Sequence, residues 1–326
     1  MFPFEYINVR ELTALPDYLE KDGEKSAILA GGTDLLGLMK EGLLKPRKVV
    51  NIKQIRELRG IRDTRKGLEI GAATRLSEIE QHPIIQQQYP VLAQAVASIA
   101  TPQLRNMGTI GGNLCQRPRC WYFRGQEYHC LKKGGDMCYA VDGLNKYHAI
   151  LGGGPCYIVH PSDAAPALIA LGATVEIFGP QGKRTVPLEE FFQLPEDNLL
   201  RENILAPNEV VTRIFVPRPE AETRSLYLKF RERQSMDFAI TSVAALVQLR
   251  NGKVQKARLV LGGVAPIPWR AREAEKILEG NSLSADRIQQ AAEAALKEAD
   301  PLDQNAYKVI LARNLIRKAF TQLQNA

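Results

Sequence analysis

The stretch Ser26-Ala-Ile-Leu-Ala-Gly-Gly-Thr-Asp-Leu-Leu36 passes from a short apolar run through two glycines into a second apolar run. Its first part predicts a buried strand, and Leu35-Leu-Gly-Leu-Met39 predicts a helix. Val49-Val-Asn-Ile52 then predicts a second strand. A strand, a turn, a helix and a strand in this order indicate a small α/β lobe that ends near residue 60.

The glycine turn of this stretch, Ala30-Gly31-Gly32-Thr33-Asp34, allows two interpretations. Glycines between a strand and a helix let backbone N–H groups approach an anion, and the start of the helix adds a favourable dipole. The turn lacks the G-x-G-x-x-G pattern and the lysine of a P-loop, so it predicts neither a Rossmann site nor a nucleoside triphosphatase. The alternative is a tight turn in which Thr33 or Asp34 caps the helix.

A second glycine element, Gly108-Thr-Ile-Gly-Gly-Asn-Leu114, offers further N–H donors and small polar side chains. It too suits a pyrophosphate group, and a purely structural turn is again the alternative. Two such turns within the first 115 residues would fit a dinucleotide that is held from both sides.

The rest of the chain divides into regular and irregular parts. Further strands are predicted at 67–71, 173–178 and 210–216, and helices at 92–99 and 164–171. Between 101 and 163 the periodicity disappears, and an irregular stretch of this length inside a compact domain tends to be functional. Pro217-Arg-Pro219 marks a domain boundary.

The C-terminal part predicts a sheet of three strands followed by helices. The strands lie at 226–230, 240–249 and 257–262, and Asn251-Gly252 is a hairpin signal between the last two. The helices lie at 270–278, 284–298 and 306–324, the second with Ser284 as its N-cap. We therefore expect an α+β protein with one domain over 1–218, made of lobes 1–60 and 61–218, and a second over 222–326.

Composition narrows the class of protein. The chain has 326 residues and a formal net charge of +7, and its cations are spread out, which favours an ordinary basic surface over a nucleic-acid site. The N-terminus lacks a basic stretch followed by an apolar core, so we expect no secretory signal. No apolar run is long enough to span a bilayer. We expect a cytoplasmic protein, with export beside a signal-bearing partner left open.

All five cysteines fall in one short segment, spaced Cys115-x4-Cys120-x9-Cys130-x7-Cys138-x17-Cys156. No C-x2-C pair occurs, which argues against zinc ribbons and bacterial-ferredoxin clusters. Thiolate ligands favour an iron–sulfur cluster or zinc over magnesium or calcium. Nearby cations would stabilise the negative charge of a four-thiolate cluster. These cations are Arg117, Arg119, Arg124, Lys132 and Lys133.

Several segments, taken in order, resemble the FAD subunits of the xanthine dehydrogenase family of molybdenum hydroxylases. They are Ala30–Leu36, Thr101–Asn106 running into Thr109–Leu114, His160–Asp163, Tyr227–Phe230 with Arg233 and Asp237, and Leu261–Pro266. The resemblance covers nearly the whole chain. It implies a two-lobed FAD-binding domain of the vanillyl-alcohol-oxidase (PCMH-type) fold, followed by the family's C-terminal domain.

The resemblance also implies which residues hold the flavin. Asp163 would hydrogen-bond the flavin moiety, and Lys229 would lie near the isoalloxazine edge, where a cation stabilises the negative charge of reduced flavin. The alternatives are a helix N-cap for Asp163 and a solvated strand lysine for Lys229. The remaining FAD-binding positions are Leu29, Ala30, Gly31, Gly32, Thr33, Asp34, Leu35, Thr101, Gly108, Thr109, Gly111, Gly112 and Asn113.

One branch of this family carries an insert after the second flavin signature that binds an additional 4Fe-4S cluster. This branch includes 4-hydroxybenzoyl-CoA reductase beta subunits and certain bacterial aldehyde oxidoreductases. Segments 120–124 and 141–152 resemble the aldehyde oxidoreductase version, and the long gap before Cys156 weakens the CoA-reductase alternative. The resemblance implies an insert over about 115–158, with Cys115 beside the flavin turn. The cluster ligands would be Cys120, Cys130, Cys138 and Cys156.

The implied function is electron transfer within a heterotrimer, with no catalytic residue in this chain. A large subunit with a molybdenum cofactor would oxidise the substrate, and a small subunit with two 2Fe-2S centres would pass electrons to FAD, where an external acceptor receives them. Two other classes stay open: a stand-alone flavoprotein oxidase, and a zinc- or cluster-containing nucleic-acid-binding protein that uses the basic, aromatic stretch 117–133. The sequence leaves the substrate, the acceptor and the role of the cluster open.

Overall fold

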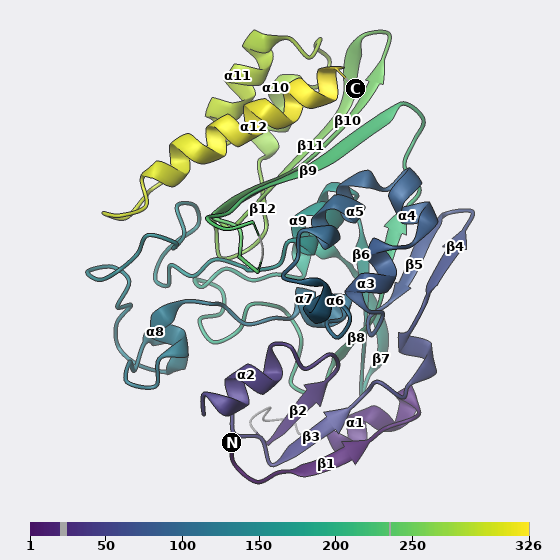
Figure 1. The fold of residues 1–326 in the computed structure, drawn as a ribbon, viewed down its shortest axis with the longest axis vertical. Helices are drawn as coiled ribbons and strands as arrows, with labels where there is room; N and C mark the ends of the chain where they lie inside the picture. The colour runs from purple at the N-terminus through teal and green to yellow at the C-terminus, as the bar shows by residue number, and fades with distance from the viewer. Residues whose placement is uncertain (20–24, 235, 326) are drawn as a thin grey trace.

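The computed structural model describes residues 1–19, 25–234 and 236–325. Three layers follow one another along the long axis of the molecule: an N-terminal lobe, a central lobe and a C-terminal sheet covered by helices (Figure 1). Much of the stretch from 101 to 163 forms loops at one side, where Figure 1 places α8 (Trp121–Arg124). The functional residues lie where these loops meet the three layers.

The N-terminal lobe is a three-stranded parallel sheet in the order β1-β3-β2. The strands are β1 (Glu5–Asn8), β2 (Ser26–Leu29) and β3 (Lys48–Asn51), and α2 (Leu35–Lys40) connects the last two. The predicted β–turn–α–β order is therefore confirmed. Strand β1 was not predicted, because three of its four side chains are exposed and show no apolar alternation. Short helical turns occupy Leu12–Ala14, Leu15–Tyr18 and Arg56–Leu58.

The central lobe contains a five-stranded antiparallel sheet in the order β4-β5-β8-β6-β7. The predicted strands are β5 (Gly67–Gly71), β6 (Thr174–Gly179) and β8 (Val210–Pro217). The two edge strands, β4 (Ile61–Thr64) and β7 (Gly182–Pro187), were not predicted because most of their side chains are polar and face solvent. Helical segments of this lobe are α3 (Leu76–Glu80), α4 (Pro83–Gln88), α5 (Pro90–Ala97), α9 (Ala164–Ala170) and the turn Leu188–Glu190.

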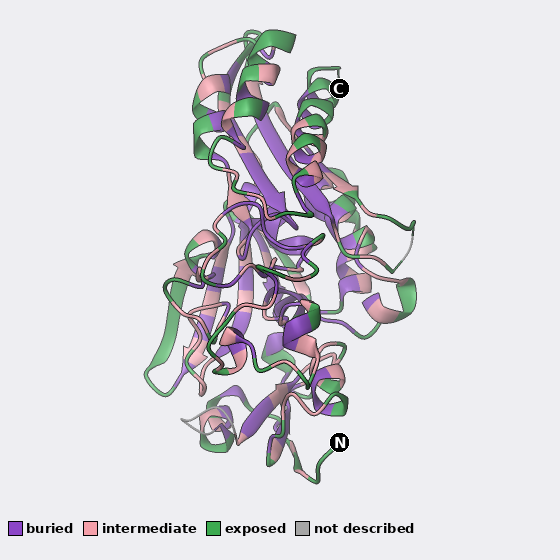
Figure 2. Cartoon of the chain, turned by 90° about the vertical axis from the view of Figure 1, so that its left-hand side faces the viewer, coloured by how far each residue is buried: buried purple, intermediate pink, exposed green. Residues whose placement is uncertain are grey.

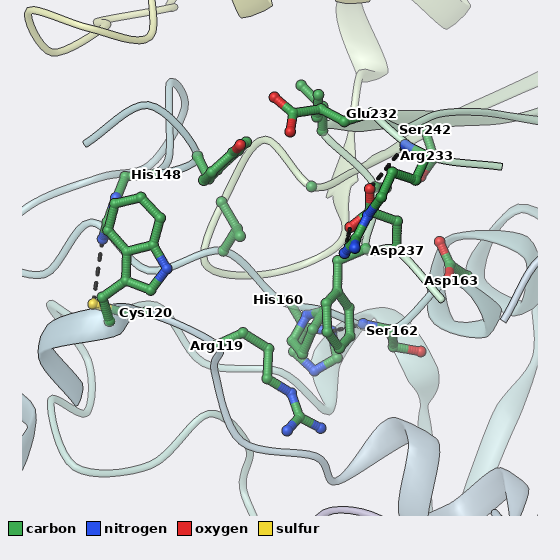
Figure 3. A pocket seen from close by; sticks show the side chains of 18 residues that line it. Arg119, Cys120, His148, His160, Ser162, Asp163, Glu232, Arg233, Asp237 and Ser242 are labelled. Atoms are coloured by element: carbon green, nitrogen blue, oxygen red, sulfur yellow. Dashed lines mark hydrogen bonds and ion pairs between the residues drawn. The ribbon is translucent and has the colours of Figure 1, made fainter. Parts of the chain in front are cut away.

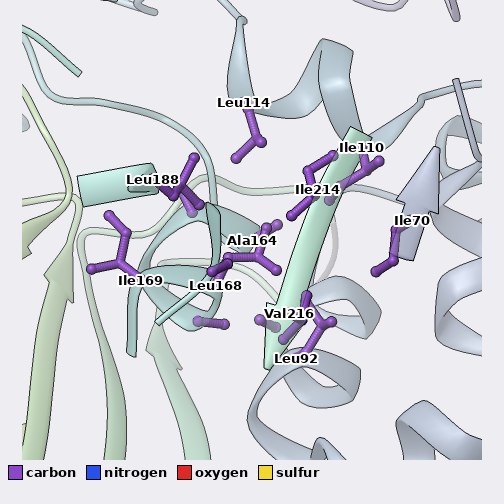
Figure 4. Close-up of a cluster of buried hydrophobic side chains, with 14 of the residues drawn as sticks. Ile70, Leu92, Ile110, Leu114, Ala164, Leu168, Ile169, Leu188, Ile214 and Val216 are labelled. Carbon is purple, nitrogen blue, oxygen red and sulfur yellow. The ribbon is translucent and has the colours of Figure 1, made fainter. Parts of the chain in front are cut away.

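The core of the central lobe fixes two of the segments that carry functional residues. Ile110 of α7 (Ile110–Leu114) and Leu168 of α9 are fully buried against the sheet residues Ile70 and Ile214 (Figure 4). Burying a large apolar side chain contributes about 1.5–3 kcal/mol. The second glycine turn and the residues just before α9 are therefore held by the core itself.

The irregular stretch predicted over 101–163 is confirmed. It contains short helical segments only: α6 (Pro102–Arg105), α7, α8 and the 3-10 turn Leu131–Lys133. No strand is assigned in this stretch, all of which the structure describes.

The C-terminal domain is an antiparallel sheet in the order β12-β11-β10-β9, packed against three helices. Figure 2 shows its strands largely buried and the outer faces of its helices exposed. Asn251 and Gly252 have φ values of 51° and 74° between β10 and β11, which confirms the hairpin. The sheet has one strand more than predicted, the two-residue β12. The elements are β9 (Thr223–Phe230), β10 (Thr241–Arg250), β11 (Lys253–Gly262), β12 (Trp269–Arg270), α10 (Arg272–Leu278), α11 (Ala285–Ala294) and α12 (Tyr307–Asn325).

Ser284 caps α11 as predicted, because its hydroxyl accepts a hydrogen bond from the Arg287 N–H. The helix ends at Ala294 rather than at residue 298. Among the described residues, none of the helices combines the length and the apolar character that crossing a membrane would require.

Candidate functional site

Two adjoining cavities lie where the N-terminal lobe, the central lobe and the C-terminal domain meet. The first has a volume of about 290 Å³ and the second about 330 Å³. Seven of the predicted FAD-binding residues line the first cavity: Thr33, Asp34, Gly108, Thr109, Gly112, Asn113 and Asp163. The second cavity extends to Cys120 and His148 (Figure 3). Five residues line both: Arg119, Pro161, Asp163, Asp237 and Phe238.

The first glycine turn lies against the backbone of the second. A Cβ on Gly31 would lie 2.2 Å from the Met107 carbonyl oxygen, so only glycine permits this approach. The N–H groups of Gly32, Thr33 and Asp34 have no hydrogen-bond acceptor among the described residues. The turn therefore keeps free donors beside the cavity, as a site for an anion requires.

The backbone N–H groups of the second glycine turn donate to acceptors within the protein. The N–H groups of Ile110, Gly111 and Gly112 donate hydrogen bonds of 3.0, 2.8 and 3.2 Å. The first two acceptors are carbonyls of the segment 72–74, and the third is the hydroxyl of Thr109, which caps α7. This turn mainly shapes the wall of the cavity, whereas the first turn presents free N–H groups.

Asp163 and Lys229 form a buried ion pair beside the first cavity. Lys229 Nζ lies 2.8 Å from Asp163 Oδ2, and the Tyr227 hydroxyl donates to Oδ1 at 2.7 Å. Burial raises the pKa of Asp163, and the charge of Lys229 opposes that rise. Both alternatives for these residues are wrong: the Asp163 side chain makes no cap bond to α9, and the Lys229 side chain is only 4% exposed.

Ser162 takes the capping role that had been considered for Asp163. Its hydroxyl accepts from the Ala165 N–H at 3.0 Å and donates to Asn113 Oδ1 at 2.6 Å. It thereby ties the start of α9 to the second glycine turn. The serine stands in the segment His160–Asp163, and the cap preference of serine was the available signal for its role.

Asp34 turns its carboxylate toward the cysteine segment. Oδ2 accepts from the backbone N–H of Arg117 at 2.7 Å, and Oδ1 pairs with the guanidinium groups of Arg124 at 2.7 Å and Arg119 at 3.0 Å. Neither Asp34 nor Thr33 caps α2 with its side chain, so the cap interpretation of this turn is wrong.

Four cysteines approach one another in the loops that carry α8. The Cys156 thiol donates to the Cys138 sulfur, and with three backbone N–H groups it lowers the pKa of Cys138 to about 6. Burial, together with the nearby Cys138 and Cys130, raises the pKa of Cys120 to about 11. In the described parts of the chain, no three His, Cys, Asp or Glu side chains converge on a point where a single metal ion could sit.

Backbone N–H groups surround these sulfurs. Cys120 accepts from residues 122 and 123, Cys138 from residues 140, 141 and 157, and Cys156 from residue 158. His148 Nε2 also lies 3.2 Å from Cys120 Sγ (Figure 3). Such donors stabilise negatively charged sulfur.

Most of the cations that were predicted to stabilise a cluster bind carboxylates or backbone carbonyls instead. Lys132 and Arg117 both pair with the buried Glu202, at 2.8 Å each. Arg119 and Arg124 pair with Asp34. Lys133 donates to a backbone carbonyl. Of the five, only Lys132 is among the charges that lower the pKa of Cys156. The prediction did not foresee Glu202, which lies about seventy residues farther along the chain.

Cys115 lies apart from the other four cysteines. It follows α7, packs against the core of the central lobe, and has its pKa raised to about 12 by burial. None of the other cysteines is among the charges that shift it.

Several predicted FAD-binding residues do not line either cavity. Leu29 and Leu35 pack in a small apolar cluster, and the Thr101 hydroxyl caps α6. Gly111 packs against Ala72, where a Cβ would lie 2.8 Å from the alanine side chain. Lys229 reaches the site through Asp163, and the Ala30 carbonyl accepts a hydrogen bond from Lys53.

The first cavity, with unpaired N–H groups on one side and a buried carboxylate–lysine pair on the other, suits an elongated anionic cofactor.

Comparisons with known proteins give the class of protein to which the chain belongs. Residues 2–219 match the family model described as the FAD binding domain in molybdopterin dehydrogenase. Residues 226–323 match the CO dehydrogenase flavoprotein C-terminal domain.

Individual relatives cover almost the whole chain. The chain is 34% identical over 299 residues to the aldehyde oxidoreductase FAD-binding subunit PaoB of Escherichia coli (strain K12), covering 90% of each. It is 30% identical over 321 residues to the carbon monoxide dehydrogenase medium chain of Hydrogenophaga pseudoflava, covering 97% of this chain and 95% of that one. A solved structure of that dehydrogenase, in a form lacking the Mo-pyranopterin moiety of the molybdenum cofactor, superimposes with a TM-score of 0.77 at 30% identity, covering 98% of both chains.

The chain is thus a subunit of an oxidoreductase. It belongs to the family of FAD-binding subunits of molybdenum hydroxylases, the family of xanthine dehydrogenase and CO dehydrogenase. The resemblance found in the sequence is confirmed at this level, and so is a mixed α/β FAD-binding domain followed by a C-terminal sheet domain. The PCMH-type fold name and the predicted domain boundaries stay predictions.

Proposed function

We propose that this chain is the FAD- and 4Fe-4S-binding electron-transfer subunit of a heterotrimeric molybdenum hydroxylase, most like an aldehyde oxidoreductase. The observation that carries the proposal is the pair of adjoining cavities: one is walled by the two glycine turns, and the other extends to Cys120. Arg119 and Asp163 are among the residues that line both cavities, which supports a flavin site next to a cysteine site.

The residues of the first cavity fit FAD. The free N–H groups of Gly32, Thr33 and Asp34 would bind the pyrophosphate, and the glycines and Asn113 would shape the opposite wall. Asp163 would accept from the flavin ring, with Lys229 behind it as a compensating charge. FAD, when bound, supplies a carrier that can take up electrons singly and pass them on singly or in pairs.

The four-cysteine segment fits a 4Fe-4S cluster better than one metal ion. In such a cluster each thiolate binds a different iron, so the sulfurs need to surround a cube rather than converge on a point. Backbone N–H groups at Cys120, Cys138 and Cys156 each act to stabilise the thiolate, and at Cys138, together with the contact to Cys156, they lower the pKa to about 6, whereas at Cys120 and Cys156 the net shift of the pKa is upward. Cys130 is buried beside Cys120 in the same apolar cluster, which would keep water from the site. Cys115 is not assigned as a ligand.

The names of the relatives support the partner chains that we propose. The relatives include chains named as medium chains or FAD-binding subunits, which implies larger and smaller companions in their complexes. We assign the molybdenum cofactor and substrate oxidation to a large subunit and the 2Fe-2S centres to a small one. An external acceptor would receive electrons at FAD in this chain. PaoB, at 34% identity, supports an aldehyde as the substrate of the complex.

Anaerobic affinity purification of the native chain from its own cells tests this proposal. We expect a larger chain with a molybdenum cofactor and a smaller chain with 2Fe-2S centres to copurify, and an aldehyde to bleach the flavin absorbance of the complex. A chain that purifies alone, with zinc and no flavin, would contradict the proposal.

A further inference from the structure

Helix α2 contacts both candidate cofactor sites. It begins directly after the first glycine turn, of which Thr33 and Asp34, with free N–H groups, line the flavin cavity. On its other side Leu38 packs in a small apolar cluster with Phe123 and the predicted ligand Cys130. Figure 1 places this helix beneath the loops that carry α8. A six-residue helix thus joins the flavin turn to the cysteine segment.

The carboxylate of Asp34 makes the polar half of this connection. All three of its partners belong to the cysteine segment and flank Cys120: the Arg117 N–H and the guanidinium groups of Arg119 and Arg124. The Asp34 side chain is 15% exposed and that of Arg124 is 13% exposed, so water screens this pair less than a surface pair. Arg124 also donates to the Pro118 carbonyl, which holds its guanidinium in place.

Arg119 extends the connection into the cavities. It lines both of them, precedes Cys120 directly, and lies over the ring of Phe238 at 5.2 Å. Phe238 belongs to the segment between β9 and β10 of the C-terminal domain. A change in the position of the Cys120 backbone would therefore move a residue in the wall of the flavin cavity.

We propose that Asp34 and α2 link the two cofactor sites, so that bound flavin stabilises the cysteine-bound cluster and the cluster stabilises flavin binding. The inference rests on the proposed function, because it needs both cofactors. The physical basis is reciprocal linkage: a segment ordered by one ligand lowers the ordering cost for the other by the same free energy. Asp34 is a positioning residue in this scheme, since its carboxylate acts through Arg117, Arg119 and Arg124.

The test measures how fast iron passes to a chelator from the full-length chain, with flavin bound and after reversible removal of the flavin. In the wild type we expect removal of flavin to speed iron loss about 5-fold or more, the low end of typical coupling between sites. In Asp34→Asn the ratio of the two rates should fall toward one, because the neutral amide cannot hold the two guanidinium groups. Asp34→Glu, which keeps the charge, should restore part of the ratio.

The matched control is Glu41→Gln. Glu41 pairs with the same Arg124 at 3.4 Å but is 46% exposed, and exposed pairs contribute little, so the wild-type ratio should persist. If Asp34→Asn does not fold, Arg124→Gln removes the same ion pair from the other side and should lower the ratio equally. A wild-type ratio near one, or an unchanged ratio in Asp34→Asn, overturns the linkage. Wild-type protein that binds flavin and no iron contradicts the proposed function itself, and the linkage fails with it.

Discussion

The proposed flavin site and the cysteine segment are built in different ways. The flavin cavity is walled by the ends of regular elements, and α7 and α9 are anchored there by fully buried apolar side chains. The cysteine segment has hardly any regular structure and is held by polar contacts with distant parts of the chain. Asp34 and Glu202 bind its arginines and a lysine. Asn305, just before α12, and Lys308, in the first turn of α12, donate hydrogen bonds to its backbone carbonyls.

This difference indicates which substitutions should weaken each site. A site built on a core is sensitive to changes in backbone spacing, and this one is also sensitive to the loss of its buried ion pair, Asp163–Lys229. A segment held by ion pairs and backbone contacts depends on each buried charge having its partner, because an unpaired buried charge is costly.

The largest effect is expected at the proposed cluster ligands. Cys138→Ser removes a thiolate that accepts three backbone N–H bonds, so the cluster should not assemble and iron should fall close to zero per flavin. Cys115→Ser is the matched control and should keep its iron, because Cys115 packs against the central core instead. Iron and flavin assays on both variants check this, and iron loss in Cys115→Ser would reassign the ligands.

The next effect is expected at the buried ion pair of the flavin site. Asp163→Asn leaves Lys229 buried with a neutral partner, so the free energy of unfolding should fall by about 3–5 kcal/mol and flavin should be lost. Tyr227→Phe removes only one hydrogen bond to the same carboxylate and should cost about 1 kcal/mol. Denaturant titration of both variants measures the difference. Equal costs would mean that the ion pair contributes little.

A smaller effect is expected from backbone spacing at the first turn. Gly31→Ala places a Cβ 2.2 Å from the Met107 carbonyl oxygen, so the turns must separate, at about 1–3 kcal/mol. Gly37→Ala, in α2 with no atom within 4 Å of the new Cβ, should be neutral or stabilise by up to about 1 kcal/mol. Flavin retention and thermal unfolding compare the two variants. Weaker flavin binding in Gly37→Ala than in Gly31→Ala would contradict the close-approach argument.

The last expected effect is a pH dependence at Lys308. Its ammonium is fully buried on the carbonyls of Tyr147, His148 and Gly263, and burial lowers its pKa to about 7. Between about pH 7 and the ordinary value of 10.5, the unfolded chain binds more protons than the folded chain, so stability should rise with pH in that window. Lys308→Met should flatten this rise in the cofactor-free chain. Denaturant titrations at several pH values check it, and an identical slope in both proteins would contradict it.

The difference between regular elements and segments held by long-range polar contacts also decides what the sequence could predict. The β2–α2–β3 unit and the Asn251-Gly252 hairpin follow from local patterns, and the structure contains both. The edge strands β4 and β7 were not predicted, because their exposed polar residues have the composition of a loop. At the site, Thr33 and Asn113 line the cavity as the family resemblance implied.

The long-range polar contacts could not be predicted from the sequence. Asp34 looked like a helix cap or a flavin contact, whereas its carboxylate partners lie more than eighty residues away. Lys308 lies in the first turn of α12, where the sequence shows only a helix, yet it is fully buried against a loop about 160 residues earlier. Pairings of this kind have no local periodicity, so sequence patterns do not indicate them.

The most direct test of the account is the cofactor content of the full-length chain purified without oxygen. We expect one FAD per chain together with about four irons and a similar amount of inorganic sulfide, since a four-cysteine cluster of this type holds that number. Flavin without iron would remove the cluster from the account and leave the FAD-binding subunit, whereas zinc in place of both would contradict the account as a whole.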